Sequence, residues 1–191
     1  LAGCYFEPEP WQLFLFSYII GLKRKDTGLR KYRLSDIYLP RKNGKTYMAA
    51  LFASWFCLMD GEAGPEVDTA ALDKDQAKIC YEAVVGIIRN SIFAECVKIY
   101  NSRDKMQSLR NSGVLKPLSR DTRNKDGLNV HAAICDERHA WPTTEMLDVI
   151  KTGMGARTQP HVMSISTAGV DVSYPYYRDI EDYKAELLGA K

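Results

Sequence analysis

Residues 39–46, Leu-Pro-Arg-Lys-Asn-Gly-Lys-Thr, join an apolar strand expected at 34–39 to a strongly apolar helix expected at 45–59. A strand, a tight turn and a helix in this order are what a phosphate-binding loop requires. Backbone N–H groups at a helix N-terminus carry partial positive charge and can surround the phosphates of a nucleotide. The stretch therefore predicts an α/β fold with an anion site at the start of this helix.

The segment Asn43-Gly-Lys-Thr46 supplies the chemistry that such a loop needs. Gly44 lets the backbone approach a phosphate closely, and Lys45 reaches the β- and γ-phosphates as a positive charge. The Thr46 hydroxyl is a suitable ligand for Mg²⁺. Because a Gly-Lys-Ser/Thr triplet occurs by chance in roughly one chain in ten of this length, the prediction depends on the flanking strand and helix.

The loop departs from the usual pattern G-x-x-x-x-G-K-[ST] at its first position, where this chain has Leu39. An ordinary strand-to-helix turn with surface cations is therefore an open alternative. Arg41 and Lys42 favour the phosphate site, because two further cations strengthen the field around a triphosphate and could sense its state in cis.

A second stretch, Val-His-Ala-Ala-Ile-Cys-Asp-Glu at 130–137, predicts a strand buried on both faces that ends in two carboxylates. Ligand sites of parallel sheets lie at the carboxyl ends of the strands, so both carboxylates are expected beside the phosphate loop. Asp136 is suited to holding Mg²⁺ through water, and Glu137 to orienting and deprotonating an attacking water. Taken alone, such a pair is more often a solvated strand end; together with the loop it predicts ATP hydrolysis.

The remaining apolar spacing completes an alternating α/β chain. A mostly parallel central sheet flanked by helices on both faces is expected. Gly21 is expected to cap the first helix, and Thr143 or Thr144 the fourth. Helices are predicted at 9–21, 45–59, 73–90 and 143–152, with a further one possible in the tail 174–191; strands are predicted at 34–39, 66–72, 130–135 and 161–166, and shorter strands of a meander or sheet edge at 97–100, 105–109 and 114–118.

Two further segments could complete a nucleotide site. The strand at 161–166 leads into Ser166-Thr-Ala-Gly169, whose hydroxyls could contact the γ-phosphate or its water. Gln12 offers a donor and an acceptor that match the edge of adenine, and Phe6 or Trp11 could stack on the base. An ordinary turn and an ordinary aromatic core residue stay open as alternatives.

The composition fits one domain with a substantial core: 191 residues, 46% hydrophobic and a net charge of +2. No apolar stretch reaches the roughly 20 residues needed to cross a bilayer. The five cysteines lack CxxC or zinc-ligand spacing, which indicates reduced thiols of a cytosolic protein. Basic clusters at 23–33 and 103–123 suggest a nucleic-acid partner, although solvated loops explain either cluster taken alone.

Five short motifs occur in a fixed order: Trp11-Gln12, Arg41 to Thr46, Asp126 to Asn129, Asp136 to Ala140 and Ser166 to Gly169. Together they resemble the ATPase domain of the terminase large subunit of tailed bacteriophages, and the resemblance covers nearly the whole chain. The phosphate loop of that family commonly departs from the standard pattern as it does at Leu39. The resemblance implies a P-loop NTPase of the additional-strand catalytic-glutamate type.

What the resemblance implies is a motor that uses ATP and Mg²⁺ to translocate double-stranded DNA into a procapsid. The motor would self-associate into a ring and work with the portal protein and the terminase small subunit. It would act in the cytoplasm of the infected bacterial host and involve no membrane.

The resemblance also assigns roles to single residues. Gln12 would belong to the adenine motif, Lys45 and Thr46 to the phosphate loop, Asp136 and Glu137 to the metal and base pair, and Thr167 to the coupling motif. A ring motor further needs an arginine from the neighbouring subunit. Arg120, Arg123 and Arg157 are the candidates, and Arg123 is favoured because it precedes the Asp136 strand in a polar loop.

The chain is expected to hold a motor domain at 1–175 and, at 176–191, the start of a linker towards a C-terminal nuclease domain. No cluster of acidic residues typical of that nuclease follows Gly169 in this sequence. Two alternatives stay open: a helicase-like nucleic-acid-dependent ATPase, because Asp-Glu-x-His occurs in that class too, and a non-catalytic nucleotide-binding module in which Glu137 is incidental.

Overall fold

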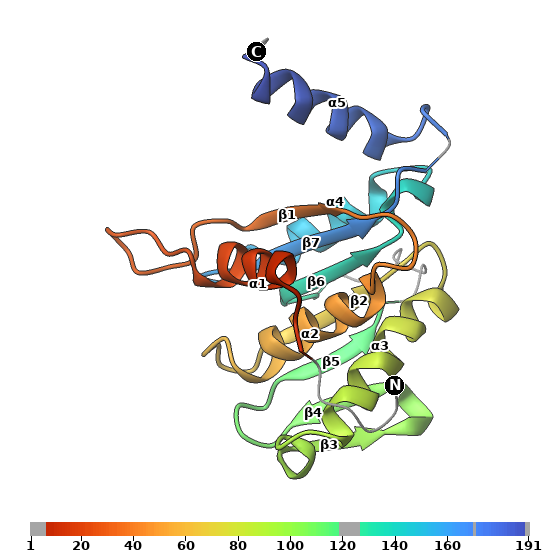
Figure 1. Ribbon diagram of the computed structural model, residues 1–191. Coiled ribbons are helices and arrows are strands. Elements are labelled where there is room, and N and C mark those ends of the chain that lie inside the picture. Colours follow the sequence, from red (N-terminus) through yellow and green to blue (C-terminus); the bar gives the residue numbers. More distant parts are fainter. Residues whose placement is uncertain (1–6, 119–126, 170, 190–191) are drawn as a thin grey trace.

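A central sheet with helices on both faces organises the chain in the computed structural model, which describes residues 7–118, 127–169 and 171–189 (Figure 1). The sheet has seven strands in the order β1-β7-β6-β2-β5-β4-β3. The strands are β1 (Leu34–Tyr38), β2 (Glu66–Ala70), β3 (Val97–Tyr100), β4 (Lys105–Ser108), β5 (Val114–Pro117), β6 (Val130–Asp136) and β7 (His161–Ser166).

Five neighbouring strands, from β1 to β5 in the sheet order, run parallel, whereas β4 is antiparallel to both of its neighbours. The mostly parallel sheet and the edge meander predicted from the sequence are therefore confirmed. Strand β7 lies between β1 and β6, and this is the additional strand that the resemblance implied. Register brings the strand ends level: Tyr38 pairs with Ser166, and Asp136 with Ile165.

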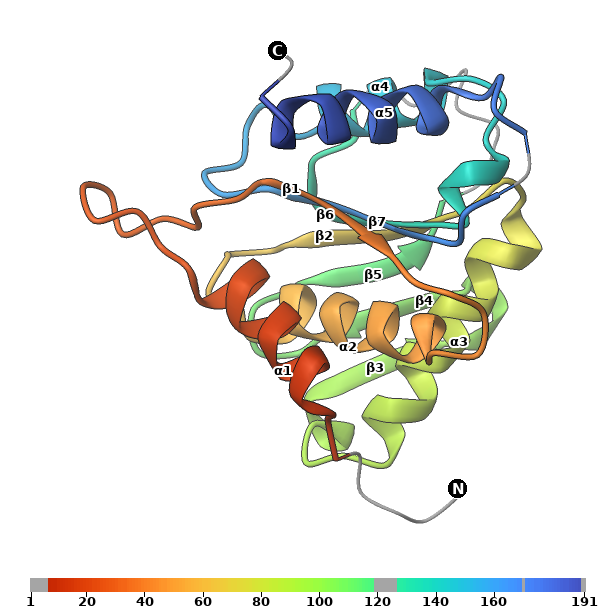
Figure 2. The same ribbon diagram turned by 45° about the horizontal axis from the view of Figure 1, so that its top comes forward.

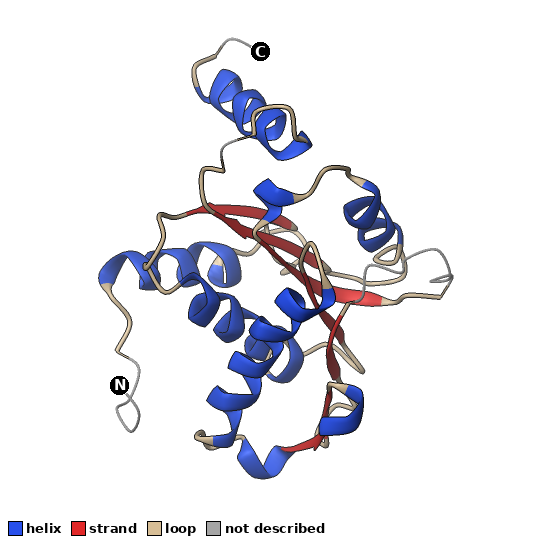
Figure 3. Ribbon diagram, turned by 90° about the vertical axis from the view of Figure 1, so that its right-hand side faces the viewer, coloured by secondary structure: helices blue, strands red, loops and turns tan. Residues whose placement is uncertain are grey.

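Helices α1, α2 and α3 cover one face of the sheet, and α4 and α5 lie on the other (Figures 2 and 3). Their bounds are α1 (Pro10–Phe16), α2 (Lys45–Leu58), α3 (Lys74–Arg89), α4 (Glu145–Thr152) and α5 (Pro175–Leu187). Each face has its own apolar core. The larger core packs Phe52 and Phe56 of α2 against β6 and β7, and the smaller one packs Leu147 and Ile150 of α4 against Trp141.

Two helix caps that were predicted from residue propensity alone differ in the structure. The first helix continues beyond Phe16 as a π-helical turn, Ser17–Gly21, and Gly21 does not form the expected cap, since Leu22 occupies that position in extended conformation. Thr144 does precede α4, but its hydroxyl donates to Asp148 at 2.8 Å and caps no backbone N–H group. At α3 the expected start holds, because the Asp73 carboxylate accepts from the Gln76 N–H at 2.8 Å.

Burial agrees with the prediction of reduced thiols. Cys57, Cys80 and Cys135 are buried and free, and Cys96 is partly buried and also free, whereas Cys4 lies outside the described residues. Burial raises the pKa of the Cys57 thiol to about 12. No helix in the described part of the chain has the length and apolar character to span a bilayer.

Candidate active site

The loop between β1 and α2 is held in an unusual backbone conformation. Lys42 and Gly44 both have positive φ, 68° and 69°, and for a lysine this region is strained. The Asn43 side-chain amide donates to the carbonyl oxygens of Pro40 and Arg41, each at 3.3 Å. The Leu39 N–H donates to the Ser166 carbonyl at 3.0 Å. The strained turn is therefore braced from within and fixed to the end of β7.

Helix α2 begins directly after this turn, and Gly44 at its N-cap offers no side chain to its first N–H groups. Those groups are left to bind an anion, and the helix dipole favours a negative ligand there. Arg41 and Lys42 are exposed beside the turn, whereas Thr46 is half-buried in the first helical turn. The Lys45 side chain is only 10% exposed, because it turns towards the end of β6.

Glu137 stands at the carboxyl end of β6 in a left-handed conformation with a φ of 45°. Its N–H donates to the Ile165 carbonyl of β7 and to the Asp136 carboxylate, each at 3.0 Å. These contacts reverse the chain direction immediately after the strand.

The Glu137 carboxylate is surrounded by polar groups from three elements. Lys45 Nζ lies 3.9 Å from its Oε1, and His139 Nδ1 lies 3.0 Å from its Oε2. The Thr167 hydroxyl donates to the same Oε2 at 3.5 Å. The structure thus brings together the phosphate-loop lysine, the expected base and the expected coupling threonine, which are far apart in the sequence.

His139 belongs to the motif Asp136 to Ala140, but no role was predicted for it from the sequence. Its backbone N–H donates to the Ser166 hydroxyl at 3.1 Å, and its Nδ1 lies 2.8 Å from the same oxygen. Gly169 packs against the ring: a Cβ there would lie 2.9 Å from the Cβ and Cδ2 of His139. The ring is therefore clamped beside Glu137. The signal in the sequence was its position two residues beyond the carboxylate.

Asp136 is partly buried, and this position changes its acidity. Desolvation and then the charge of Glu137 raise its pKa to about 6, although the Glu137 N–H and Lys45 oppose the rise. Two carboxylates packed together in this way favour a nearby cation. Among the described residues no group of three or more carboxylate, imidazole or thiol side chains could hold a metal ion.

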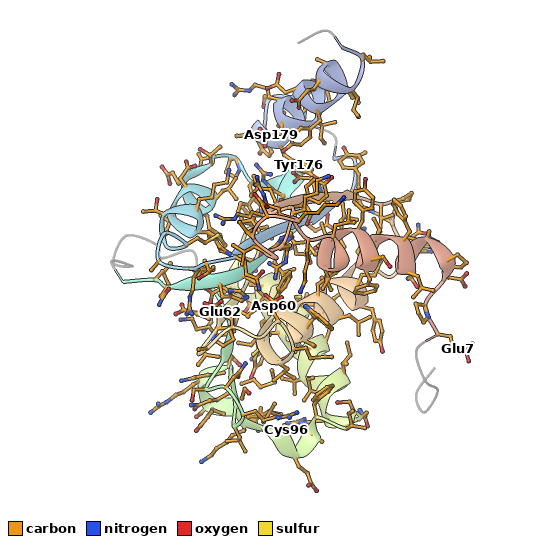
Figure 4. The ribbon with its side chains drawn as sticks, turned by 90° about the vertical axis from the view of Figure 1, so that its left-hand side faces the viewer. Glu7, Asp60, Glu62, Cys96, Tyr176 and Asp179 are labelled. Carbon is orange, nitrogen blue, oxygen red and sulfur yellow. The ribbon has the colours of Figure 1, made fainter. Side chains whose placement is uncertain are left out.

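Arg138, between the base and the histidine, was also given no role from the sequence. Its buried guanidinium donates to Asp36 at 3.2 Å and Ser164 at 3.3 Å, and it pairs with Asp179 of α5. It also lies over the Tyr176 ring, 5.0 Å from the centroid. Figure 4 shows Asp179 and Tyr176 together on the side of α5 that faces the sheet. Arg138 therefore fastens α5 to the turn that carries Glu137.

Gln12 is buried, and its side-chain oxygen accepts from the Glu9 N–H at 2.9 Å. In the structure this side chain closes the first turn of α1, and its contact with adenine stays a prediction. Phe6 lies outside the described residues, whereas Trp11 is 37% exposed on α1.

The three arginine candidates have different outcomes. Arg120 and Arg123 lie outside the described residues. Arg157 sits near the amino ends of β2 and β6, the edge opposite the phosphate loop, where Asp60 and Glu62 also lie (Figure 4). Its guanidinium donates to Glu62 and to the carbonyl oxygens of Ala63, Gly64 and Asn129 at 2.8–3.1 Å. Because it is so fully bound, Arg157 is removed as a candidate for action in a neighbouring site.

Comparison with known proteins assigns the family of this constellation. The family described as the terminase large subunit ATPase domain matches residues 10–185. The large terminase subunit of Enterobacteria phage HK97 is 29% identical over 138 residues, which are 70% of this chain and 27% of that protein. Protein YmfN of Escherichia coli K12 is 42% identical over 55 residues, 29% of this chain and 12% of that one. The aligned regions thus span less than a third of the length of either relative.

Solved structures share the fold. The crystal structure of the HK97 large terminase superposes with a TM-score of 0.82 at 23% identity, covering 97% of this chain and 38% of that one. The large terminase ATPase domain of Thermus phage P74-26 gives 0.60 at 18% identity over 82% and 70%. A large terminase of a thermophilic bacteriophage, solved with ADP, gives 0.59 at 11% identity over 83% and 38%. With its phosphate loop, glutamate and additional strand, the chain belongs to the family of terminase large subunit ATPase domains.

Proposed function

We propose that this chain hydrolyses ATP and that the energy released drives double-stranded DNA into a viral procapsid. The observation that carries the proposal is the convergence of Lys45, Glu137 and Thr167 at one end of the parallel sheet. A helicase-like ATPase and a non-catalytic nucleotide-binding module are less well supported, because the family match covers residues 10–185 and the glutamate is clamped by several partners.

Different residues of the site would bind the phosphates, hold the metal ion and accept the proton. Lys45 and the first N–H groups of α2 bind the β- and γ-phosphates, and Arg41 and Lys42 add positive charge at the mouth of the loop. Asp136 and the Thr46 hydroxyl would hold Mg²⁺, which would offset charge on the phosphate oxygens. Glu137 accepts a proton from the attacking water, and His139 holds the carboxylate in position.

The pair between Lys45 and Glu137 must open when a phosphate takes the lysine. The glutamate is then left against His139 and Thr167, where it can turn towards a water. Thr167 leaves β7 directly, so its contact with the base would pass the state of the phosphate into the sheet. This supports the coupling role proposed for Thr167.

Several partners belong to the same proposal. A ring of these chains would act at a portal protein with the small terminase subunit, in the cytoplasm of the infected bacterial host. Arg123 of one subunit would complete the site of its neighbour, a contribution of about 10³ to 10⁵ in rate in related phosphate-transfer enzymes. Residues 1–175 would form the motor, and 176–191 the start of a linker towards a nuclease domain.

Two variants test the proposal, with ATP binding and phosphate release measured separately. Glu137→Gln should bind ATP at least as tightly as the wild type, because Lys45 is no longer held by a carboxylate, and should release no phosphate. Lys45→Ala should lose ATP binding. Turnover by Glu137→Gln would reject Glu137 as the base, and a wild-type chain that does not bind ATP would reject the function.

A further inference from the structure

A two-stranded arm, residues 22–31, projects from the amino edge of the sheet, opposite the phosphate loop (Figures 1 and 2). Lys23 and Arg30 form an antiparallel bridge across it. The Arg24 N–H donates to the Leu29 carbonyl and the Lys31 N–H to the Leu22 carbonyl, at 2.8 and 2.9 Å. Gly28, with a φ of 68°, makes the turn at the tip. The arm is therefore a defined hairpin.

Positive charge is concentrated on and beside this arm. Residues 23–33 hold six of the 26 lysines and arginines of the chain but one of its 24 acidic residues. Because the net charge of the chain is only +2, the rest of the chain is net negative. Any polyanion that approaches the protein is therefore attracted to this region more than to the remaining surface.

Most of these cations are available to an external partner. Lys23, Lys25 and Lys31 are exposed and form no ion pair within the described ranges. Arg24 contacts Asp26 at 3.5 Å, but both side chains are more than 60% exposed, and such a surface pair is weak. Lys31 lies over the Tyr32 ring at 5.2 Å, a contact that positions its charge without neutralising it.

The sixth cation anchors the arm to the core. The Arg30 guanidinium is buried, pairs with Asp60, donates to the Gln159 carbonyl at 2.9 Å, and lies 4.8 Å from the centroid of the Phe56 ring. Asp60 in turn contacts His131 Nε2 at 2.6 Å. The root of the arm is thus fixed, so little conformational entropy is lost there when the arm binds a partner.

A hollow of about 500 Å³ lies along the arm and its root. Its lining includes Arg24, Lys31 and Arg33, a single acidic residue, Asp26, and the neighbouring Tyr32 and Leu34. The Arg33 guanidinium is directed by a bond to the Thr158 carbonyl at 2.9 Å. Cations therefore surround a concave surface, which suits a phosphate backbone better than a flat contact would.

We propose that this arm binds the phosphate backbone of double-stranded DNA. Duplex DNA presents about one negative charge per 1.7 Å of its axis, so a row of lysines finds phosphates on any sequence. Phosphate contacts position a protein on DNA without reading bases, as a motor moving along any genome needs. The inference rests on the proposed translocation of DNA, but it assigns the contact to a surface away from the ATP site.

The test measures binding of the full chain to a labelled duplex of random sequence at several salt concentrations. The triple variant Lys23→Ala, Lys25→Ala and Lys31→Ala should weaken binding at least tenfold and reduce the slope of log K against log salt by about 3, since each phosphate contact contributes about 0.9. ATP turnover without DNA should be unchanged, because these side chains lie outside the site.

A matched control removes three positive charges from a different part of the surface, around the outer strands β3 and β4. Lys98, Arg103 and Arg110 are exposed around β3 and β4, and Lys98 also lies over a tyrosine ring, at 5.2 Å. Replacing these three by alanine should leave affinity and salt slope within twofold of the wild type. Equal losses in both triple variants would show a general charge effect and overturn the proposal.

Two further outcomes distinguish a failure of the arm proposal from a failure of the proposed function. If the wild type binds DNA and the arm variant binds equally well, the arm does not contact DNA and the proposal is wrong, even if the variant loses binding to an acidic protein. If the wild type itself shows no salt-dependent DNA binding while it hydrolyses ATP, the proposed translocation fails, and the arm proposal fails with it.

Discussion

The Nδ1 atom of His139 lies 3.0 Å from Oε2 of Glu137 and 2.8 Å from the Ser166 hydroxyl. One ring nitrogen thus joins the catalytic turn after β6 to the end of β7. A proton on this nitrogen can be donated to the carboxylate, whereas the unprotonated nitrogen can accept from the serine. The histidine is therefore a positioning residue for the Glu137 carboxylate.

Replacing His139 tests this role. His139→Ala should lower the rate of ATP hydrolysis by about 10- to 100-fold, the equivalent of one hydrogen bond to a charged group, and leave ATP affinity unchanged. His139→Asn, which keeps a donor, should recover part of the rate. Separate measurement of kcat and of ATP affinity checks this. Equal losses of kcat and ATP affinity in the alanine variant, or no recovery in His139→Asn, would assign the histidine a structural role only.

Asp136 should make metal-free stability depend on pH. Its folded pKa of about 6 exceeds the ordinary 3.8, so the native state holds the proton more tightly than the unfolded state. The free energy of unfolding must then fall as pH rises from about 4 to 6 and stay lower above that window. Asp136→Asn should therefore be more stable than the wild type by about 2 kcal/mol at pH 7.5.

Urea unfolding at pH 7.5 and pH 4 checks this without Mg²⁺ or nucleotide. The advantage of Asp136→Asn should shrink towards zero at pH 4, where the native aspartic acid is already neutral. The same variant should bind ATP with little benefit from Mg²⁺. An advantage independent of pH would show that desolvation of the charged carboxylate is not its cause.

The attachment of α5 depends on the pair between Arg138 and Asp179. Asp179→Asn should weaken this attachment by about 1–2 kcal/mol, so amide hydrogens of α5 should exchange about 5- to 30-fold faster. Exchange in β6 and β7 should be unchanged. Glu186→Gln removes the same charge from the same helix but breaks no ion pair among the described residues, so its α5 amide hydrogens should exchange as in the wild type.

Arg157 and Arg123 should respond in opposite ways. Arg157→Met removes the donors that tie Glu62 to the loops before β2 and β6, and should lower the free energy of unfolding by about 3 kcal/mol. Turnover per folded molecule should remain. Arg123→Met should leave stability unchanged and lower turnover only under conditions in which subunits assemble. Lost turnover in folded Arg157→Met would reinstate that residue as a catalytic candidate.

Local patterns predicted the parallel sheet well, because strands buried on both faces have few alternatives. The run Val130 to Cys135 and the segment His161 to Ser166 contain no lysine, arginine, aspartate or glutamate, and they form the buried strands β6 and β7. The Gly44-Lys-Thr turn likewise fixed the start of α2. Contacts between distant segments were harder to foresee, since periodicity gives the face of a side chain and not its partner.

Arg138 illustrates this difference. An arginine directly after the acidic pair Asp136-Glu137 looks like a surface charge, yet it is buried because Asp36 and Asp179 reach it from β1 and α5. Arg157 is a second example: its local sequence predicted none of the backbone carbonyl groups among which the fold places it. Gly21 failed as a cap because tertiary packing extends the helix by a π-turn that propensity does not encode.

Strand β1, which leads into the phosphate loop, is also the outer strand of the sheet. An outer strand can recruit a strand from another molecule and start aggregation. Here it is only five residues long, and its central Asp36 is held by Arg138 and by the Tyr183 hydroxyl at 3.0 Å. A short strand with an internal charge resists such pairing. Copies of the chain can therefore lie close together without β1 pairing with a strand of another copy and starting aggregation.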